Sequence, residues 1–295
     1  MEEHIVNDSL KRMREVLEKV IDSHGGKEIS PFLEDVNRVS SSEHMYPGGR
    51  RVEKDGSVDE VKPKLEKVDP LVLKGNRVFS LFHDHEMTDQ IALLRAQLIA
   101  KLNETGGNSL LITSALPGEG KTFISINLGV SLSLELDRSI FIIDADLKNP
   151  SRLHYDFSRD FFGINCGCGL ADYLIGQVRL PQIFVNPGIE RLTLLPAGRQ
   201  LSNSAELLNS YNMKELVAKL KAFPSASGRI LIFDSPSLLA PDALVLAEFV
   251  DGIVIVVEEN RTKEDDLRHA MDLLKRKSIF GIVLNKSGNK EIQHV

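Results

Sequence analysis

The 295-residue sequence is short of several features, and each shortage excludes a class of protein. It has no tryptophan and only two cysteines, Cys166 and Cys168, which lie too close for an unstrained disulfide and have no second pair to complete a metal site. No apolar run approaches the roughly 18 residues of a membrane-spanning helix, and the acidic residues 1–8 are unlike a signal peptide. A net charge of −6 gives no general case for binding nucleic acid. We therefore expect a cytoplasmic globular protein with no nucleic-acid partner.

The composition changes along the chain and divides it into three parts. Residues 8–22 carry apolar side chains at helical three- and four-residue spacings, so residues 1–22 are expected to form a short amphipathic helix. Residues 23–69 are polar, with glycine and serine clusters and few large apolar residues. Because such a segment cannot bury enough surface to offset the entropy of ordering it, we expect a flexible linker. Residues 70–295 are expected to form the folded body.

Apolar strands and helical patterns alternate within this body. The strand candidates are residues 110–114, 140–144, 192–196, 230–234, 253–257 and 281–285. Helical patterns cover residues 87–103, 121–134, 204–222, 241–249 and 263–277. Continuously apolar strands that alternate with helices indicate an α/β fold, with a mostly parallel sheet and helices on both faces. Ligands of such sheets bind beyond the carboxyl ends of the strands.

The first of these strands runs straight into a glycine-rich loop, residues 115–122, which ends in Gly-Lys-Thr. The spacing is that of a P-loop, with alanine in the first glycine position. Small residues let successive backbone N–H groups form a nest for the β-phosphate, Lys121 reaches the β- and γ-phosphates, and the Thr122 hydroxyl ligates Mg²⁺. The following helix adds partial positive charge at its N-terminus. The sequence therefore predicts a site for ATP and Mg²⁺, with nucleotide contacts from Pro117, Gly118, Glu119, Gly120, Lys121, Thr122 and Phe123.

Polar residues at the ends of three other strands complete the predicted site. Asp144 and Asp146 end an apolar strand on the same side, because the strand period is two, and they suit Mg²⁺ binding or the acceptance of a proton from a hydroxyl. Asp234 ends a run of four apolar residues, the Walker B pattern, and is expected at the metal. Asn285 ends the last strand and is expected beside the nucleotide base. The predicted catalytic residues are thus Lys121, Asp144 and Asp146, and the predicted metal ligands are Thr122, Asp144 and Asp234.

Together these motifs resemble the bacterial tyrosine kinases (BY-kinases) of capsule and exopolysaccharide export, which belong to the wider group of MinD- and ParA-like P-loop ATPases. The stretches similar to their Walker A, Walker A′ and Walker B motifs are residues 117–122, 144–154 and 234–236. Further similar stretches are residues 169–176, 195–198 and 203–208. The resemblance spans roughly residues 70–286 and implies Mg·ATP-dependent phosphoryl transfer to protein tyrosine. It also implies an integral membrane partner, a polysaccharide co-polymerase or chain-length protein, that holds the chain at the inner membrane.

Three features differ from the pattern of that family. Leu116 stands where the MinD and ParA branch carries a lysine that reaches across a dimer, which favours the kinase branch. The last eight residues contain no tyrosine, so we expect no phosphorylated C-terminal cluster; Tyr46 in the predicted linker is the candidate acceptor, and the other three tyrosines are expected to be structural. The ring-forming helix of the family carries glutamate and two arginines at three-residue spacing, and the equivalent residues here are Asp89, Ala92 and Arg95.

The sequence leaves more than one function open. The leading hypothesis is a kinase whose N-terminal helix, on its tether, contacts the membrane partner. The alternative is a MinD-like nucleotide switch, or a regulatory interaction protein of the polysaccharide machinery, without kinase activity. A homo-oligomer is compatible with either hypothesis, although the altered helix at Asp89, Ala92 and Arg95 leaves the ring contact incomplete. A scaffold for a metal cluster shared between two chains would depend only on Cys166 and Cys168.

Overall fold

The computed structural model describes residues 63–82, 86–135, 138–148, 157–222 and 228–287, and the predicted helix 1–22 and most of the predicted linker lie outside them. Its centre is an eight-stranded sheet. Six of the strands match the predicted ones: β2 Ser109–Ser114, β3 Ser139–Asp144, β5 Leu192–Leu195, β6 Arg229–Asp234, β7 Gly252–Glu258 and β8 Ile279–Asn285. The other two are short, β1 Lys64–Leu65 and β4 Val185–Asn186.

The strand order is β1-β4-β5-β3-β6-β2-β7-β8, and all neighbours are parallel except β4 and β5. This order places β2, which precedes the P-loop, beside β6, and it places β6 beside β3. The carboxyl ends of these three strands therefore meet at one edge of the sheet. The predicted mostly parallel α/β architecture is confirmed.

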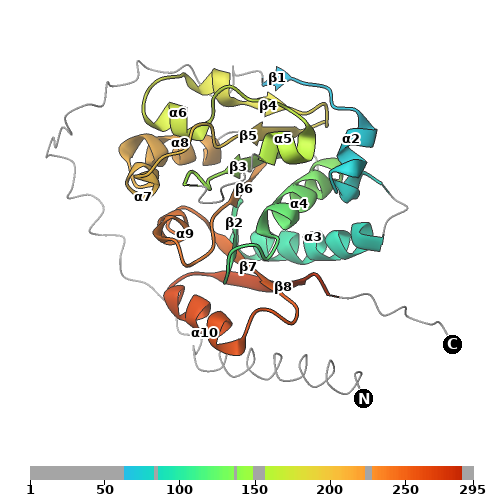
Figure 1. Cartoon of the computed structure of the whole chain (residues 1–295), viewed down its shortest axis with the longest axis vertical. Helices are drawn as coiled ribbons and strands as arrows, with labels where there is room; N and C mark the ends of the chain where they lie inside the picture. The colour runs from blue at the N-terminus through green and yellow to red at the C-terminus, as the bar shows by residue number, and fades with distance from the viewer. Residues whose placement is uncertain (1–62, 83–85, 136–137, 149–156, 223–227, 288–295) are drawn as a thin grey trace, which may run out of the picture. The chain divides into compact units, whose positions relative to one another are not determined.

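Helices cover both faces of the sheet (Figure 1). Those on the side of α4 are α2 Pro70–Gly75, α3 Glu86–Thr105, α4 Lys121–Glu135 and α5 Phe157–Phe162. Those on the other side include α6 Leu170–Leu174, α7 Ser204–Leu208, α8 Tyr211–Lys221, α9 Pro241–Leu246 and α10 Glu264–Leu273. Two short 3₁₀ turns, η3 Phe79–Leu81 and η4 Leu180–Ile183, complete the set in this part of the chain. No helix of the described segments is long and apolar enough to cross a membrane.

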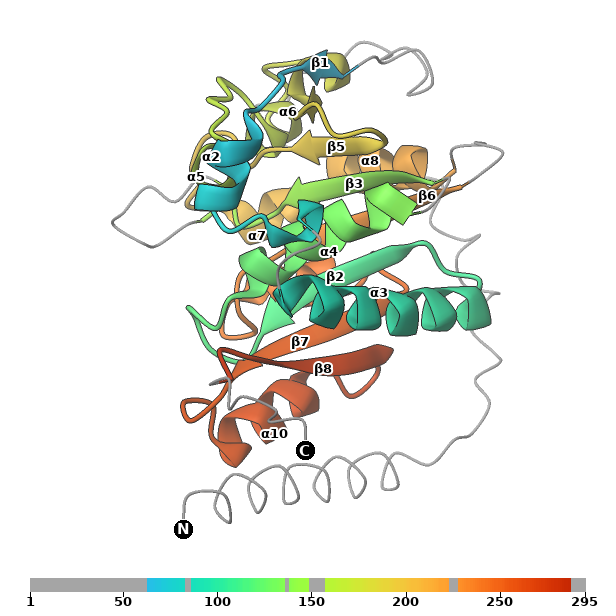
Figure 2. The ribbon, with the colours of Figure 1, turned by 90° about the vertical axis from the view of Figure 1, so that its right-hand side faces the viewer.

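Helix α4, which follows the P-loop, is the most deeply buried helix of the core. Residues 124–133 are all buried, because the sheet covers one side of the helix and α3 packs on the other. Gly129 permits the close approach to β3, since a Cβ there would lie 2.5 Å from Cδ1 of Ile142. The helix is therefore fixed against the strands that carry the acidic residues, and its N-terminus holds the P-loop at their carboxyl ends (Figure 2).

The structure refines two boundaries of the sequence prediction. The pattern over residues 204–222 predicts one helix, but the structure has α7 and α8, because Ser210 between them caps α8 by accepting a hydrogen bond from the Met213 N–H at 3.4 Å. The folded body begins before residue 70, since Lys64 and Leu65 pair with β4. A two-residue strand of this kind carries no periodic signal in the sequence.

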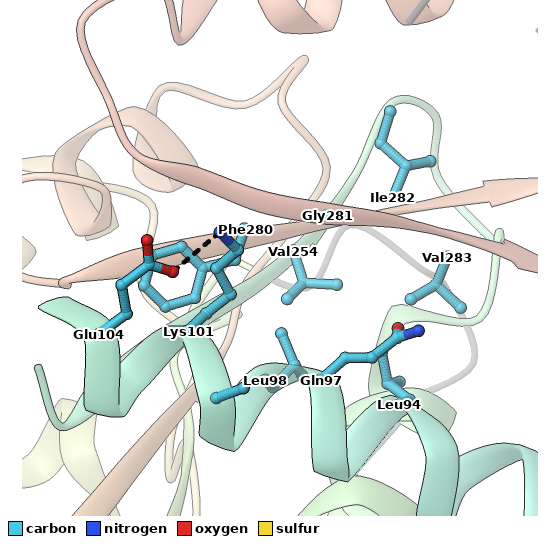
Figure 3. A pocket seen from close by; sticks show the side chains of 11 residues that line it. Leu94, Gln97, Leu98, Lys101, Glu104, Val254, Phe280, Gly281, Ile282 and Val283 are labelled. Carbon is cyan, nitrogen blue, oxygen red and sulfur yellow. Dashed lines mark hydrogen bonds and ion pairs between the residues drawn. The ribbon is translucent and has the colours of Figure 1, made fainter. Parts of the chain in front are cut away.

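A cavity of about 370 Å³ lies between α3 and the edge of the sheet at β7 and β8. Figure 3 shows Leu94 and Leu98 of α3 facing Val254 and Val283, with an ion pair at one end of the cavity. None of the predicted nucleotide-binding residues lines it. This cavity is therefore separate from the candidate site described below.

At the amino ends of the strands, Asp251, which precedes β7, forms hydrogen bonds with the start of β2. Its carboxylate accepts hydrogen bonds from the N–H groups of Asn108 and Ser109, from the Ser109 hydroxyl at 2.6 Å and from Nζ of Lys221 at 3.0 Å. Burial alone would raise the pKa of Asp251, but these hydrogen bonds outweigh burial and lower it. The ionised carboxylate therefore stabilises the fold.

We expect Asp251→Asn to lower the free energy of unfolding by about 2 kcal/mol at pH 7, because it weakens several charge-assisted hydrogen bonds at once. A lowered pKa in the folded state means that this stabilisation is present above the ordinary value of 3.8 and disappears as the pH falls below it. Urea unfolding at pH 7 and pH 3 measures both effects. The exposed Asp272→Asn is the matched control and should change stability by less than about 0.5 kcal/mol. An equal loss for Asp251→Asn at both pH values would contradict this assignment.

Candidate functional site

The P-loop lies between the end of β2 and the start of α4, at the carboxyl edge of the sheet. Two of its glycines have positive φ angles, +84° at Gly118 and +94° at Gly120, which other residues rarely adopt. Gly120 is also closely packed, since a Cβ there would lie 2.1 Å from Nδ2 of Asn285. The glycines of the motif are therefore required both by the backbone conformation and by a neighbouring side chain.

Glu119 is fully buried, and its carboxylate is used within the protein. One oxygen accepts a hydrogen bond from the Leu116 N–H at 2.7 Å, and the other accepts one from the Thr262 hydroxyl. The side chain of Glu119 thus links two residues of the P-loop and connects the loop to the segment after β7. Because the carboxylate of Glu119 is already hydrogen-bonded, a phosphate would contact this residue through its backbone N–H.

Three further side chains hold the P-loop from outside. Nη2 of Arg261 donates to the carbonyl of residue 117 at 2.8 Å, Nζ of Lys286 donates to that of residue 118 at 2.9 Å, and Nδ2 of Asn285 donates to that of residue 119 at 2.8 Å. The sequence predicted Asn285 beside the nucleotide base, whereas the structure places its amide nitrogen on the P-loop backbone. Arg261 and Lys286 were not predicted, because nothing local in the sequence connects them with a loop more than 140 residues away.

Glu258 pairs with both of these cations. Its Oε2 lies 2.8 Å from Nη1 of Arg261 and 3.0 Å from Nζ of Lys286. The hydrogen bonds from Arg261 and then from Lys286 lower the pKa of the Glu258 carboxyl, and the contact with Glu258 raises the pKa of Arg261. Both shifts favour the charged forms of Glu258 and Arg261.

The predicted acidic residues come together on two neighbouring strands. Asp144 and Asp234 are register partners at the carboxyl ends of β3 and β6, and both side chains are buried. The Asp146 N–H donates to Oδ1 of Asp144 at 3.2 Å, and the Asp146 carboxylate acts electrostatically on Asp234. The structure thus groups all three predicted carboxylates beside the P-loop.

Asp234 has the most perturbed environment of the three. Burial raises its pKa to about 6, and repulsion from Asp146 adds to this, although Lys121 and hydrogen bonds from Thr122 and Ser125 act in the opposite direction. The Ser125 hydroxyl donates to Oδ1 of Asp234 at 3.0 Å from the first turn of α4. Ser125 lies one helical turn after Lys121, a spacing that marks it as a neighbour of the loop, but no sequence motif identified it.

These residues suit a divalent cation held together with a nucleotide. A buried carboxylate of raised pKa is stabilised by a nearby cation, and the Thr122 hydroxyl already bonds to Asp234. In the described segments no group of three histidine, cysteine, aspartate or glutamate residues is arranged to hold a metal alone. Mg²⁺ is commonly bound in this way, by one or two carboxylates with phosphate oxygens and water. Thr122, Asp144 and Asp234 therefore fit the predicted metal site.

Three other residues that the sequence singled out, Phe123, Cys166 and Cys168, have contacts of their own. The Phe123 ring packs edge-on against Phe79 of η3, with ring centroids 6.1 Å apart, and its partly buried side chain packs against the core. Its contact with the nucleotide stays a prediction. Cys166 and Cys168 are both free thiols, and the Cys168 Sγ lies 3.5 Å from the carbonyl oxygen of Gln182.

The chain is similar in sequence to proteins named as bacterial tyrosine kinases. The chain is 32% identical over 189 residues to the tyrosine-protein kinase YwqD of Bacillus subtilis, a match that covers 63% of this chain and 74% of YwqD. It is 33% identical over 195 residues to a Klebsiella pneumoniae protein named as a tyrosine-protein kinase in a cps region, which covers 65% of this chain but only 26% of that protein. The chain thus spans about a quarter of the length of the second relative. No family model matches it.

Solved structures agree at the level of the fold. The kinase domain of the Escherichia coli tyrosine kinase ETK superposes with a TM-score of 0.62 at 23% identity, covering 77% of this chain and 92% of that domain. MinD of Pyrococcus horikoshii superposes with a TM-score of 0.50 at 24% identity, over 62% of this chain and 72% of MinD. Since YwqD shares about a third of its residues over most of its length, and the P-loop and three carboxylates are grouped as the sequence predicted, the chain belongs to the bacterial tyrosine kinase family.

Proposed function

We propose that the chain is a Mg·ATP-dependent protein-tyrosine kinase that acts in the synthesis or export of an extracellular polysaccharide. The observation that carries the proposal is the register pairing of Asp144 with Asp234 beside the P-loop. Two carboxylates paired in this way could share one metal ion, which supports the metal-assisted phosphoryl transfer that we propose. The names of YwqD and of the Klebsiella relative support the tyrosine acceptor and the polysaccharide context.

Each residue of the site would have a distinct role in phosphoryl transfer. The P-loop N–H groups and Lys121 hold the phosphates, and Thr122 and Asp234 fix the position of Mg²⁺. Asp144 or Asp146 orients the hydroxyl of the acceptor and takes its proton. Mg²⁺, when bound, neutralises charge on the transferred phosphoryl group. Positioning and charge neutralisation are most of what an in-line phosphoryl transfer needs from the protein.

Four tyrosines are available in the sequence as acceptors within this chain. Tyr173 is buried, but the side chain of Tyr211, at the start of α8, is 75% exposed. The sequence predicted a structural role for Tyr211, and its exposure contradicts that role. Tyr46 and Tyr155 lie outside the described residues. Tyr46 and Tyr211 are therefore the acceptors that we propose for phosphorylation by a second copy.

Incubation of the chain with Mg·ATP should yield phosphotyrosine on the wild type but not on Lys121→Ala, because that variant lacks the cation that reaches the β- and γ-phosphates. Mass spectrometry maps the modified residues, and released phosphate is counted in parallel. Tyr211→Phe and Tyr46→Phe show which acceptor is used. Phosphotyrosine of equal yield on the lysine variant would mean that a contaminating kinase produced it.

We also propose a membrane-bound partner, a polysaccharide co-polymerase or chain-length protein, that contacts the N-terminal residues 1–22 and keeps the chain at the inner membrane. The apolar spacing of residues 8–22 and the long polar segment behind it support this contact. The phosphosite assay should therefore be repeated with the cytoplasmic segment of such a partner present.

A second candidate function is a nucleotide-controlled switch with slow ATP hydrolysis and no protein substrate. One contact favours it: Nη1 of Arg95 donates to the Ser131 hydroxyl at 2.7 Å and to its carbonyl at 3.3 Å, so this arginine of the ring-forming helix is engaged with α4 of its own chain. Released phosphate without phosphotyrosine, even with the partner segment present, would favour the switch over the kinase.

A further inference from the structure

Three consecutive carbonyl groups of the P-loop accept hydrogen bonds from side chains of other segments. Those of residues 117–119 accept hydrogen bonds from Arg261, Lys286 and Asn285 in that order, at 2.8, 2.9 and 2.8 Å. The three donors come from the loop after β7 and from the end of β8, not from the P-loop motif itself. Two of the three donors are cations, and hydrogen bonds from charged donors are roughly twice as strong as those between neutral groups.

Anchoring a carbonyl also fixes the direction of the N–H group in the same peptide unit. The described part of the chain has no cis peptide bonds, and across a trans peptide the C=O and the next N–H point to opposite sides. Because the carbonyls of residues 117–119 point toward their three donors, the N–H groups of Gly118, Glu119 and Gly120 point away from those donors. The positive φ angles at Gly118 and Gly120 allow successive units to adopt this arrangement, which is the geometry of an anion-binding nest.

Glu258 keeps the two cations at these carbonyls. One carboxylate oxygen contacts both Nη1 of Arg261 and Nζ of Lys286, which leaves Nη2 of Arg261 and the remaining protons of Lys286 for the loop. Without this carboxylate each of the two long side chains would lose its ion pair and keep only its hydrogen bond to the loop. Glu258 thus acts on the loop through its neighbours, even though its own charge is negative.

We propose that Arg261 and Lys286, held by Glu258, are positioning residues that turn the P-loop N–H groups toward the nucleotide phosphates. The proposal rests on the proposed nucleotide binding. It explains in addition which side chains hold the loop in its binding conformation before the nucleotide arrives. In this proposal the two cations have two effects. They orient the peptide groups of the loop, and they also attract the negatively charged nucleotide.

The test uses the full chain and three variants, Arg261→Gln, Lys286→Gln and Glu258→Gln. We expect each of the first two to weaken Mg·ADP binding by about tenfold, with most of the loss recovered in Arg261→Lys and Lys286→Arg. Glu258→Gln distinguishes positioning of the loop from simple attraction of an anion by positive charge. Bulk electrostatics predicts tighter binding of an anion when a negative charge is removed, whereas loss of positioning predicts binding weaker by about threefold. The control is Arg268→Gln, an exposed i,i+4 pair partner on α10, which should bind as the wild type does.

Calorimetric titrations with Mg·ADP and with AMP, which lacks the β-phosphate, provide the readout. The proposal expects losses for Mg·ADP and unchanged AMP binding, with nucleotide-free melting temperatures within a few degrees of the wild type. Equal losses for both nucleotides would show a general structural defect, and tighter binding by Glu258→Gln would show simple charge attraction; either result overturns the proposal. A wild-type chain that binds no Mg·ADP would instead refute the proposed function.

Discussion

Gly120→Ala is expected to abolish nucleotide binding, with a loss of at least about 100-fold in Mg·ADP affinity. An alanine must adopt a φ near +94°, and its Cβ would lie 2.1 Å from the amide nitrogen of Asn285. Asn285 is almost fully buried and already bonds to the carbonyl of Glu119, so it can move away only by giving up that hydrogen bond. Backbone strain and the displaced amide together should also lower the free energy of unfolding by roughly 2 to 4 kcal/mol.

Gly106→Ala is the matched control for this prediction. Gly106 has a φ of +67° as well, but a Cβ there would meet nothing within 4 Å. This variant should lose only the backbone strain, about 1 kcal/mol, and bind Mg·ADP as the wild type does. Calorimetric titration and urea unfolding of both variants measure the two effects. Gly120→Ala that binds within threefold of the wild type would show that the loop is not packed as described.

Asp234→Asn is expected to raise the stability of the nucleotide-free protein while it reduces phosphoryl transfer by at least about 100-fold, roughly 3 kcal/mol in the barrier. The loss of transfer would follow from the loss of the negative charge at the proposed metal site. The gain in stability has a different cause. Burial raises the pKa of Asp234 from 3.8 to about 6, so the folded state carries a penalty for the ionised carboxylate that the neutral amide avoids.

The stability gain should depend on pH in a defined direction. With a raised pKa, the folded protein binds more protons than the unfolded chain between pH 4 and 6, so wild-type stability falls as the pH rises through this window. The advantage of Asp234→Asn, roughly 2 kcal/mol, should therefore be complete above pH 6 and vanish by about pH 4. Urea unfolding at pH 4, 6 and 8 measures it, with the exposed Asp265→Asn as control. A variant less stable than the wild type at pH 8 would contradict the buried-charge argument.

The fold class and the residues of the proposed chemistry can be read from the order of the amino acids. The P-loop is a local motif: its spacing specifies small residues, a lysine and a threonine within eight positions. Asp144, Asp146 and Asp234 each follow an apolar strand, and strands of a parallel sheet end at one edge, so their grouping follows from the chain pattern alone. The six longer strands were predicted for the same reason, because burial on both faces leaves a continuous apolar run.

The contacts that hold the P-loop and the charge state of the site depend on the tertiary structure. Arg261 and Lys286 reach the P-loop from segments more than 140 residues away, and Glu258 acts on the loop only through them. Side-chain contacts at such separation leave no periodic signal in one sequence. The P-loop contact of Asn285 was missed for the same reason: the end of its strand was predictable, but the direction of its amide depends on how β8 packs beside the loop. The pKa of Asp234 likewise depends on burial and on neighbours from two other segments. Local spacing fixes which groups are present, whereas their orientation and charge state arise from packing between distant parts of the chain.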